Sequence, residues 1–220
     1  MTARPLRVAH ITTIDLSLRY LLLNQLRFLQ ARGYEVTGIS APGPDVHAIE
    51  AAGIRHIAVP MTRRMTPVAD AVSLLRLLRV LRRERFDIVH THNPKPGLIG
   101  QIAARLAGVP IVVNTIHGLY FHERSPWLRR AVFSTLERVA ARCSDRILSQ
   151  SREDVDTMLA TGVCAPALIR HLGNGIEVAR FRPGAVPRDD VRRLRAEFDL
   201  GDGPVVGFVG RLVAEKGVPE

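Results

Sequence analysis

Short apolar runs alternate with longer segments of helical periodicity along most of this chain, and this alternation constrains the fold more than any other feature. Such a pattern is typical of a parallel sheet whose strands are joined by crossover helices. It predicts strands at residues 6–11, 35–40, 55–59, 88–92, 111–115, 146–149 and 167–171. It predicts helices at residues 18–32, 45–52, 68–85, 95–107, 127–143 and 152–161. We therefore expect an α/β fold, a Rossmann-like parallel sheet with helices on both faces.

The pattern changes in the stretch 173–203, which is rich in Gly, Pro and charged residues and carries one helical segment, residues 189–198. A new apolar run at residues 205–209 then precedes Gly210. We assign residues 1–183 to a first domain, 184–203 to a linker, and 204–220 to the first strand and turn of a second domain. Because a lone strand cannot pair its backbone polar groups, we expect the natural protein to continue beyond Glu220.

The chain carries 31 basic and 21 acidic side chains, a net charge of +10, and nearly all the basic residues are Arg. Such an excess attracts polyanions, whether nucleic acid, an anionic bilayer or a diphosphate. A nucleic acid is not expected as a partner, because the aromatic residues are not interleaved with the basic ones as a stacking platform requires. The two cysteines, Cys143 and Cys164, suggest neither a disulfide framework nor a thiolate metal site.

The sequence shows no apolar run of the about 20 residues that a membrane-spanning helix needs, and no signal-peptide pattern, so we expect a cytoplasmic protein. The helix expected at residues 68–85 has one face of leucines and another of arginines. The leucines, which we expect in the core, are Leu74, Leu77, Leu78 and Leu81, and the arginines are Arg76, Arg79 and Arg83. With Arg63 and Arg64, these arginines predict electrostatic contact with the anionic inner face of the plasma membrane, without deep insertion.

Histidines stand near the ends of two expected strands, at the edge where ligands bind in open parallel sheets. His92 and Asn93 lie at the end of residues 88–92, and His117 comes just after residues 111–115 and is followed by a glycine. These residues are candidates for the wall of a ligand cleft. His90 and His92 share one face of their strand, which is a geometry that could hold a metal. Because no carboxylate or third ligand is grouped nearby, we do not expect a metal there. We expect no cofactor either.

Two loops supply further candidates for the same cleft. Asp15 and Ser17 lie in the turn that follows the first strand, where they could bond substrate hydroxyl groups. Ser17 directly precedes a helical pattern, which favours a role as the cap of that helix. Asn174 and Glu177 lie in the loop Gly-Asn-Gly-Ile-Glu at residues 173–177, whose glycines permit positive φ. We expect this loop to border the cleft, with a plain turn as the alternative.

The last motif is Gly-Arg-Leu-Val-Ala-Glu-Lys-Gly at residues 210–217, at the end of the last expected strand. A strand followed by such a turn can present two cations, Arg211 and Lys216, and the backbone N–H groups around Gly210 to a diphosphate. A basic surface turn is the alternative for an isolated motif of this kind. Its place after a linker and a complete run of strand–helix units favours the ligand site.

The whole chain resembles the retaining GT-B glycosyltransferases of family 4. The resemblance rests on the strand order, the Val-His-Thr-His-Asn segment, the His117–Gly118 turn, the loop 173–177 and the motif 210–217. It implies the acceptor-side, amino-terminal half of an enzyme that moves a hexosyl-type sugar, with retention, from a nucleotide-diphosphate sugar to a saccharide or lipid-linked acceptor. It implies a role in cell-surface polysaccharide or glycolipid synthesis, without a metal.

The resemblance also implies roles for single residues. Gly210, Arg211 and Lys216 would hold the donor diphosphate, and His117 would face the cleft and contact the transferring sugar. The donor-selecting glutamates of the family would lie beyond the last residue, so we expect this chain alone to be inactive. Two alternatives share the architecture: a nucleotide-sugar epimerase, and a subunit without activity of its own that binds an acceptor or docks on a membrane.

Overall fold

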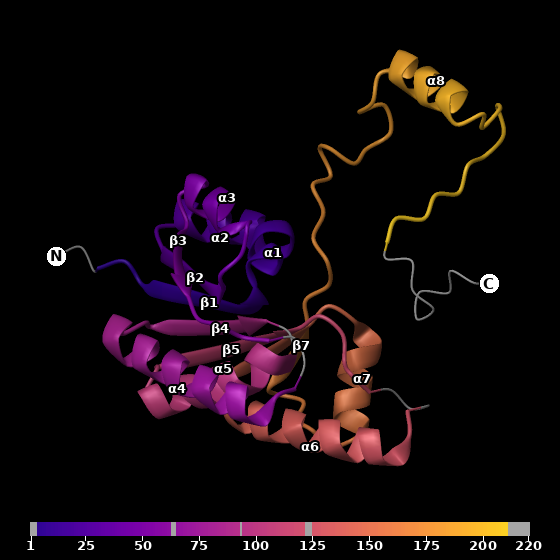
Figure 1. Ribbon diagram of the computed structural model, residues 1–220. Helices are drawn as coiled ribbons and strands as arrows, with labels where there is room; N and C mark the ends of the chain where they lie inside the picture. Colours follow the sequence, from indigo (N-terminus) through magenta and orange to yellow (C-terminus); the bar gives the residue numbers. More distant parts are fainter. Residues whose placement is uncertain (1–3, 63–64, 93, 122–124, 211–220) are drawn as a thin grey trace. The chain divides into compact units, whose positions relative to one another are not determined.

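The computed structural model describes residues 4–62, 65–92, 94–121 and 125–210 (Figure 1). The chain divides into two compact units, Met1–Asn174 and Gly175–Glu220, so the division falls inside the Gly-rich loop 173–177. Every strand found among the described residues belongs to the first unit.

A seven-stranded parallel sheet forms the centre of the first unit, in the order β3-β2-β1-β4-β5-β6-β7. The strands are β1 (Arg7–Ile14), β2 (Glu35–Ala41), β3 (Arg55–Ala58), β4 (Ile88–His92), β5 (Ile111–Ile116), β6 (Arg146–Ser149) and β7 (Ile169–His171). The expected Rossmann-like sheet is confirmed. The order turns back at β1, which lies between β2 and β4. Ligands of open parallel sheets bind outside the carboxyl ends of the strands at such a switch point.

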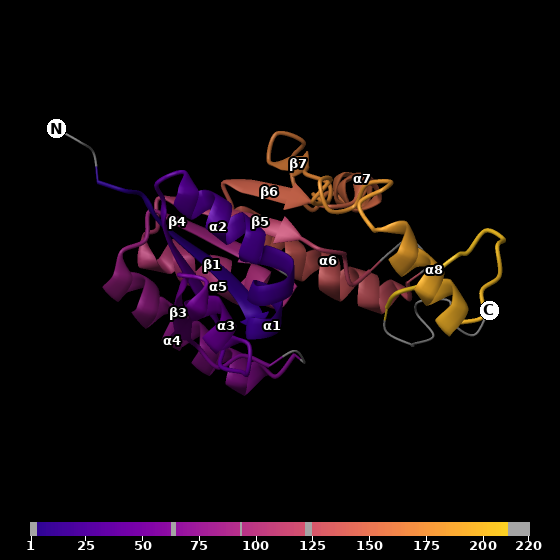
Figure 2. The ribbon, with the colours of Figure 1, turned by 90° about the horizontal axis from the view of Figure 1, so that it is seen from above.

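Helices cover both faces of this sheet: Figure 1 shows α1 to α3 on one side of the strands and α4 to α6 on the other. The helices of the first unit are α1 (Asp15–Ser17), η1 (Leu18–Leu22), α2 (Leu23–Ala31), α3 (Val46–Ala51), α4 (Pro67–Glu84), α5 (Pro94–Ala107), α6 (Trp127–Arg142) and α7 (Arg152–Ala160). Seen from above, in Figure 2, α2 crosses over the strands at the middle of the sheet. The single helix expected at residues 18–32 therefore begins earlier, at Asp15, and contains the π-helical turn η1.

Three apolar clusters hold the layers together. The largest lies between the sheet and helices α4 and α5, where Leu77 and Leu81 are buried and Leu74 and Leu78 pack against the cluster, as expected. A second cluster lies under η1, α2 and α3, and a third joins β5, β6 and β7 to α6 and α7. Each fully buried leucine contributes about 1.5–3 kcal/mol relative to an exposed one.

Two glycines let α5 approach the sheet closely. A Cβ atom on Gly97 would lie 3.2 Å from the Oδ1 atom of Asn114, and one on Gly100 would lie 2.9 Å from the Cγ2 atom of Thr91. The Thr91 hydroxyl in turn donates a hydrogen bond of 2.9 Å to Asn114 Oδ1. Because α5 begins soon after β4, this packing fixes the first turns of the helix beside the carboxyl end of that strand.

In the second unit the described residues form one helix, α8 (Arg188–Glu197), and irregular or extended chain. The strand expected at residues 205–209 is not formed, since this run pairs with no strand in the described part of the chain. Val206 and Val209 are fully exposed, at 99% and 102%. The physical reason is the one that makes any lone strand unstable: its backbone N–H and C=O groups need a neighbouring strand. The assignment of residues 184–203 and 204–220 stays a prediction.

The described residues contain no helix that is both long and apolar enough to cross a membrane. Cys143 and Cys164 are both free, as the sequence predicted. Burial raises the pKa of each thiol, so neither has the lowered pKa of a reactive cysteine.

Candidate functional site

Histidines gather on one face of the sheet where β1 meets β4, at the switch point of the strand order. The register pairs His10 of β1 with His90 of β4, and strand alternation puts His92 on the same face. His10, His90 and His92 are at most 7% exposed. The same face continues on β5 through Thr115, which pairs with His92, and then to the half-buried His117 just beyond the end of that strand.

Hydrogen bonds link three of these rings in series, and we call His10, His92 and His117 the imidazole row. His10 Nδ1 lies 3.0 Å from His92 Nε2, and His92 Nδ1 lies 3.2 Å from His117 Nε2. His117 Nδ1 lies 2.9 Å from the amide oxygen of Gln150, just past the end of β6. The row thus crosses from β1 over β4 to the carboxyl end of β5, and Gln150 continues it to the end of β6. His90 stands beside it: its Nε2 atom bonds to the Thr115 hydroxyl at 2.7 Å, and its ring stacks on His92.

Burial keeps these imidazoles neutral. It lowers the pKa of His10 to about 3, because the charged ring would lose its hydration. Burial also lowers the pKa of His90 and His92 well below the ordinary value, and the neighbouring imidazoles lower it further. At His117 burial lowers the pKa as well, while the hydrogen bond to Gln150 opposes that shift. The rings therefore act at neutral pH as hydrogen-bonding groups without charge.

The sequence-based expectation that His90 and His92 have no third ligand nearby is wrong. His10 joins them, and ligand nitrogens of the three rings lie within 4.8 Å of one another. The signal was missed because His10 stands on the first strand, 82 positions before His92, and only the strand order brings the two together. The prediction that the protein needs no metal is a separate matter and stays a prediction.

Asp15 joins two neighbouring turns at the carboxyl edge of the sheet. Its carboxylate is buried and accepts the backbone N–H of Asp45 at 2.7 Å. A Cβ atom on Gly43 would overlap this carboxylate, so only glycine fits there. Asp15 is therefore satisfied inside the protein without a ligand. The expected capping role of Ser17 is wrong, because the helix starts at Asp15 and Ser17 lies within it, with Ile14 as the N-cap residue.

Beside His117, the backbone of Gly118 has a φ of +127°, a conformation that residues with a Cβ atom rarely adopt. Apart from the two neighbouring residues in the chain, no atom of the described residues lies within 4 Å of the place where its Cβ would be, so open space lies beside this glycine. Lys95, which sequence reasoning passed over, is 3% exposed at the start of α5. It pairs with Asp70 and donates a hydrogen bond of 2.8 Å to the Thr62 hydroxyl, so its charge is neutralised within the protein.

The remaining predicted residues lie in exposed or undescribed chain. Asn174 is exposed at the end of the first unit, after Gly173, whose φ is +73°. Glu177 is exposed in the second unit, and Gly210 lies there in an exposed bend. Asn93, Arg211, Lys216, Arg63 and Arg64 fall outside the described residues.

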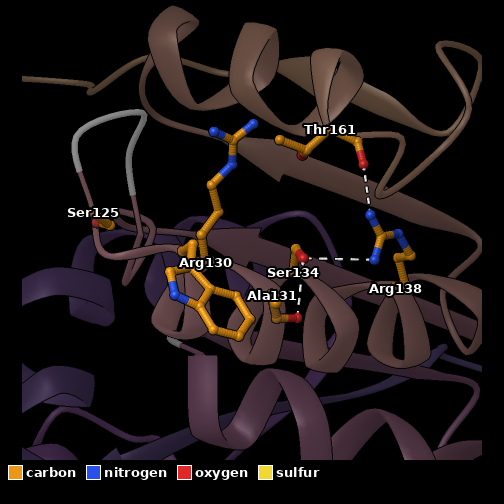
Figure 3. A pocket seen from close by; sticks show the side chains of 7 residues that line it. Ser125, Arg130, Ala131, Ser134, Arg138 and Thr161 are labelled. Atoms are coloured by element: carbon orange, nitrogen blue, oxygen red, sulfur yellow. Dashed lines mark hydrogen bonds between the residues drawn. The ribbon is translucent and has the colours of Figure 1, made fainter.

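A groove of about 500 Å³ runs along α6 (Figure 3), and sequence reasoning missed it. It is lined by Ser125, Trp127, Arg130, Ala131, Ser134, Arg138 and Thr161. Arg138 donates a hydrogen bond of 2.7 Å to the carbonyl oxygen of Thr161, which ties α6 to the end of α7. Gln150, which bonds to His117, lies just before the start of α7, whereas Thr161, which lines the groove, lies at the other end of that helix. The groove is therefore separate from the histidine cluster at the switch point.

Comparison with known proteins gives the family. The sequence model of Glycosyltransferase Family 4 matches residues 20–180. The chain is 31% identical to the UDP-Gal:alpha-D-GlcNAc-diphosphoundecaprenol alpha-1,3-galactosyltransferase of Escherichia coli, over 98% of this chain and 56% of that protein. It is 29% identical to the capsular polysaccharide biosynthesis glycosyltransferase CapM of Staphylococcus aureus, over 97% of this chain and 55% of that protein.

Among solved structures, Anabaena HepE in complex with UDP and glucose matches with a TM-score of 0.71 and 15% identity, over 96% of this chain and 55% of that one. The chain thus spans about half the length of the curated relatives it matches. The sheet and its helices share their fold with the amino-terminal half of GT-B glycosyltransferases. The family match covers both β4 and β5, and so the strands that carry His92 and lead to His117; the chain belongs to Glycosyltransferase Family 4.

Proposed function

We propose that this chain is the acceptor-side half of a glycosyltransferase that moves a hexosyl-type sugar from a nucleotide-diphosphate sugar to a saccharide or lipid-linked acceptor. The observation that carries the proposal is the family match over residues 20–180. The strand order supports the proposal, because open parallel sheets bind ligands outside the carboxyl ends of their strands at a switch point such as that between β1 and β4, and we propose that the reacting sugar lies there, near His117. A nucleotide-sugar epimerase can have the same fold, so only transfer of the sugar to an acceptor distinguishes the proposed function from epimerisation.

The chemistry we propose is a transfer with retention. The bond between the anomeric carbon and the diphosphate oxygen breaks, and the acceptor hydroxyl bonds to that carbon on the same face. The hydroxyl proton passes to the departing phosphate oxygen, so no covalent intermediate on the protein is needed. Negative charge grows on the leaving diphosphate, and fixed cations and N–H groups stabilise it best in a site closed from water. Gly210, Arg211 and Lys216 have this role in the proposal, through their likeness to the family motif.

His117 is the residue that we propose to contact the transferring sugar. Its ring is half-buried, and open space lies beside Gly118. Both ring nitrogens already have partners, His92 and Gln150. A sugar hydroxyl can therefore bond to an imidazole nitrogen only by displacing one of them, whereas contact with a carbon edge of the ring needs no exchange. Asp15, Ser17, His92, Asn93, Asn174 and Glu177 remain candidates for the cleft wall, and we propose no metal.

The proposed partner surface is an anionic membrane, contacted through α4. Arg76, Arg79 and Arg83 are exposed on this helix. Val68, Val72 and Leu75 lie among them and are 82%, 42% and 49% exposed. From the sequence we expected the apolar face of α4 to consist of core leucines, and the membrane contact to be purely electrostatic. These exposed apolar side chains support an additional, shallow apolar contribution.

A product assay tests the function and distinguishes it from its rivals. The protein that joins this chain to a donor-binding half is incubated with nucleotide sugars, with and without saccharide or lipid-linked acceptors. We expect nucleoside diphosphate to be released and the sugar to appear on the acceptor. An isomerised nucleotide sugar, formed without an acceptor, would show an epimerase instead. If sugar is never transferred but acceptor or vesicles are bound, the chain is an acceptor-binding or docking subunit.

A further inference from the structure

The rings of the imidazole row meet end to end. The ring centroids of His10 and His92 are 5.2 Å apart, while the bonded nitrogens are only 3.0 Å apart. The difference equals about the width of one imidazole ring, so the two nitrogens point at each other along the line of centres. His92 and His117 show the same relation, with 5.4 Å between centroids and 3.2 Å between nitrogens. Both contacts are therefore N–H···N hydrogen bonds rather than stacked faces.

The far end of the row fixes the direction of these bonds. The amide oxygen of Gln150 can only accept, so His117 must carry its proton on Nδ1. A neutral His117 then has a bare Nε2 atom, which accepts from Nδ1–H of His92. By the same step, His92 Nε2 accepts from Nδ1–H of His10. Each ring is thereby assigned one tautomer.

The near end of the row agrees with this direction. His10 Nε2 is buried and has no hydrogen-bond partner in the described structure. In the tautomer just assigned, this atom is a bare acceptor. The opposite direction would leave a buried N–H group without an acceptor, which proteins tolerate less often than an unpaired acceptor. The row of hydrogen bonds therefore ends inside the protein at the unpaired Nε2 atom of His10, and at the carboxyl edge of the sheet at His117.

We propose that His10 and His92 are positioning residues for His117: together they hold the His117 ring in one orientation and one tautomer, with its proton on Nδ1. That His117 contacts a sugar rests on the proposed function, whereas the hydrogen bonds of the row are independent of it. A ring held in this way needs no reorientation when a ligand arrives, which lowers the entropy cost of a productive contact. A hydrogen bond accepted at one nitrogen also strengthens the bond donated by the other.

A metal ion fits the same three rings less well. Metal–nitrogen bonds to imidazole are about 2.0–2.1 Å long, so two nitrogens facing each other across a metal would stand roughly 4 Å apart. Those of His10 and His92 are 3.0 Å apart along the line of centres, which suits a shared proton. The third ring, His90, stacks on His92 with centroids 4.2 Å apart and has its Nε2 atom bonded to Thr115. The lone pairs thus do not converge on one point.

Nuclear magnetic resonance on this chain, labelled with ¹⁵N in its 8 histidines, tests the proposal without any sugar transfer. We expect scalar coupling across two hydrogen bonds, from His10 Nδ1 to His92 Nε2 and from His92 Nδ1 to His117 Nε2. We also expect the nitrogen shift of a protonated atom at His117 Nδ1 and of a bare atom at Nε2. Single His→Leu variants assign the signals.

Variants distinguish two effects on His117: orientation by the hydrogen bonds of the row, and packing against buried neighbouring rings. His92→Leu should turn the single His117 tautomer into an exchanging mixture, because Nε2 loses its donor. His90→Leu is the matched control: His90 is also buried and its ring stacks on His92, but it lies outside the row, and His117 should keep its tautomer. His10→Leu should weaken the His92–His117 coupling, and His10→Asn, whose side-chain N–H₂ replaces Nδ1–H, should restore most of it. Backbone amide spectra confirm that each variant is folded.

Three results would overturn the proposal. The first is an absence of both couplings in the folded wild-type chain. The second is a His117 tautomer that responds equally to His90→Leu and His92→Leu, since that would mean packing alone. The third is stoichiometric binding of added Zn²⁺ that shifts the signals of His10, His90 and His92 together, since that would make the cluster a metal site.

Discussion

Glu84 holds arginine side chains together at the amino-terminal edge of the sheet. Its carboxylate accepts hydrogen bonds of 2.7 and 3.1 Å from Arg55, one of 3.1 Å from Arg83 and one of 3.3 Å from Arg7. The hydrogen bonds from Arg55 lower the pKa of Glu84 most, and the carboxyl ends with a pKa of about 2 against an ordinary value of 4.5. The ionised form is therefore favoured by folding.

We expect Glu84→Gln to lower the free energy of unfolding by about 1–2 kcal/mol at neutral pH. The loss is smaller than for a fully buried ion pair, because Arg55 and Arg83 are exposed and water screens their charges. A depressed pKa stabilises the fold above the unfolded value of 4.5 and loses that effect as pH falls toward about 2. The difference between wild type and variant should therefore shrink below about pH 4.5 in urea titrations. Glu197→Gln, an exposed change in α8, is the control. A difference that is constant with pH would contradict this account.

Single residues also show where sequence reasoning stops. His92 and His117 could be found because each stands near the end of a strand that the sequence itself reveals. His10 could not, because its contact with His92 depends on β1 lying beside β4 and on a register that no local pattern encodes. The prediction that Ser17 caps the helix was wrong for a local reason: the helix starts at Asp15, three residues before the start that the apolar periodicity predicts.

At the scale of elements, the turn after β1 and the turn after β2 fit together through Asp15 and Gly43. We expect Gly43→Ala to cost about 1–3 kcal/mol of stability, because the added Cβ would overlap the Asp15 carboxylate. In an Asp15→Ala background the same change should cost much less, and a double-mutant cycle measures this coupling. Gly203→Ala is the control, since among the described residues only the chain neighbours come within 4 Å of a Cβ at that position. Equal costs in both backgrounds would contradict the contact.

The surface of α4 supports a second prediction at this scale. Changing Arg76, Arg79 and Arg83 to Gln should weaken co-sedimentation with anionic vesicles about fivefold per arginine at low salt, since each contributes about 1 kcal/mol. Changing Val68 and Leu75 to Ser should weaken the part of the binding that survives high salt. Arg188, Arg192 and Arg193 changed to Gln give a control with the same change in net charge. Equal binding of all variants to anionic and neutral vesicles would leave α4 as an ordinary solvated face.

Most elements of the first unit could be predicted from the sequence, because nearly every strand buries apolar side chains and each long helix carries an apolar face. The bounds of β4 and β6 agree with the expected ranges. The π-helical turn η1 has no such signal, since its sequence, Leu-Arg-Tyr-Leu-Leu, is equally compatible with an α-helix. The run 205–209 has the composition of a buried strand, but composition alone cannot supply the neighbour that a strand needs.

At the scale of the whole molecule, the chain matches about half the length of its curated relatives, so transfer itself is a proposal about a two-half enzyme. In that enzyme we expect Arg211→Ala or Lys216→Ala to lower kcat/KM about ten- to a hundredfold, since each removes a charge-assisted hydrogen bond worth about 1.5–3 kcal/mol. Steady-state kinetics measure the loss. Leu212→Ala, between the two cations, is the control, and an equal loss there would point to the fold of the turn instead of its charge.

The stereochemistry of the product tests the central claim most directly. The two-half enzyme is given a nucleotide sugar of known anomeric configuration and an acceptor, and the new glycosidic bond is examined by proton nuclear magnetic resonance before any equilibration. The account predicts a glycoside with the anomeric configuration of the donor, formed together with one nucleoside diphosphate per sugar transferred. An inverted glycoside would contradict the proposed retention, and an epimerised nucleotide sugar without any glycoside would contradict glycosyl transfer altogether.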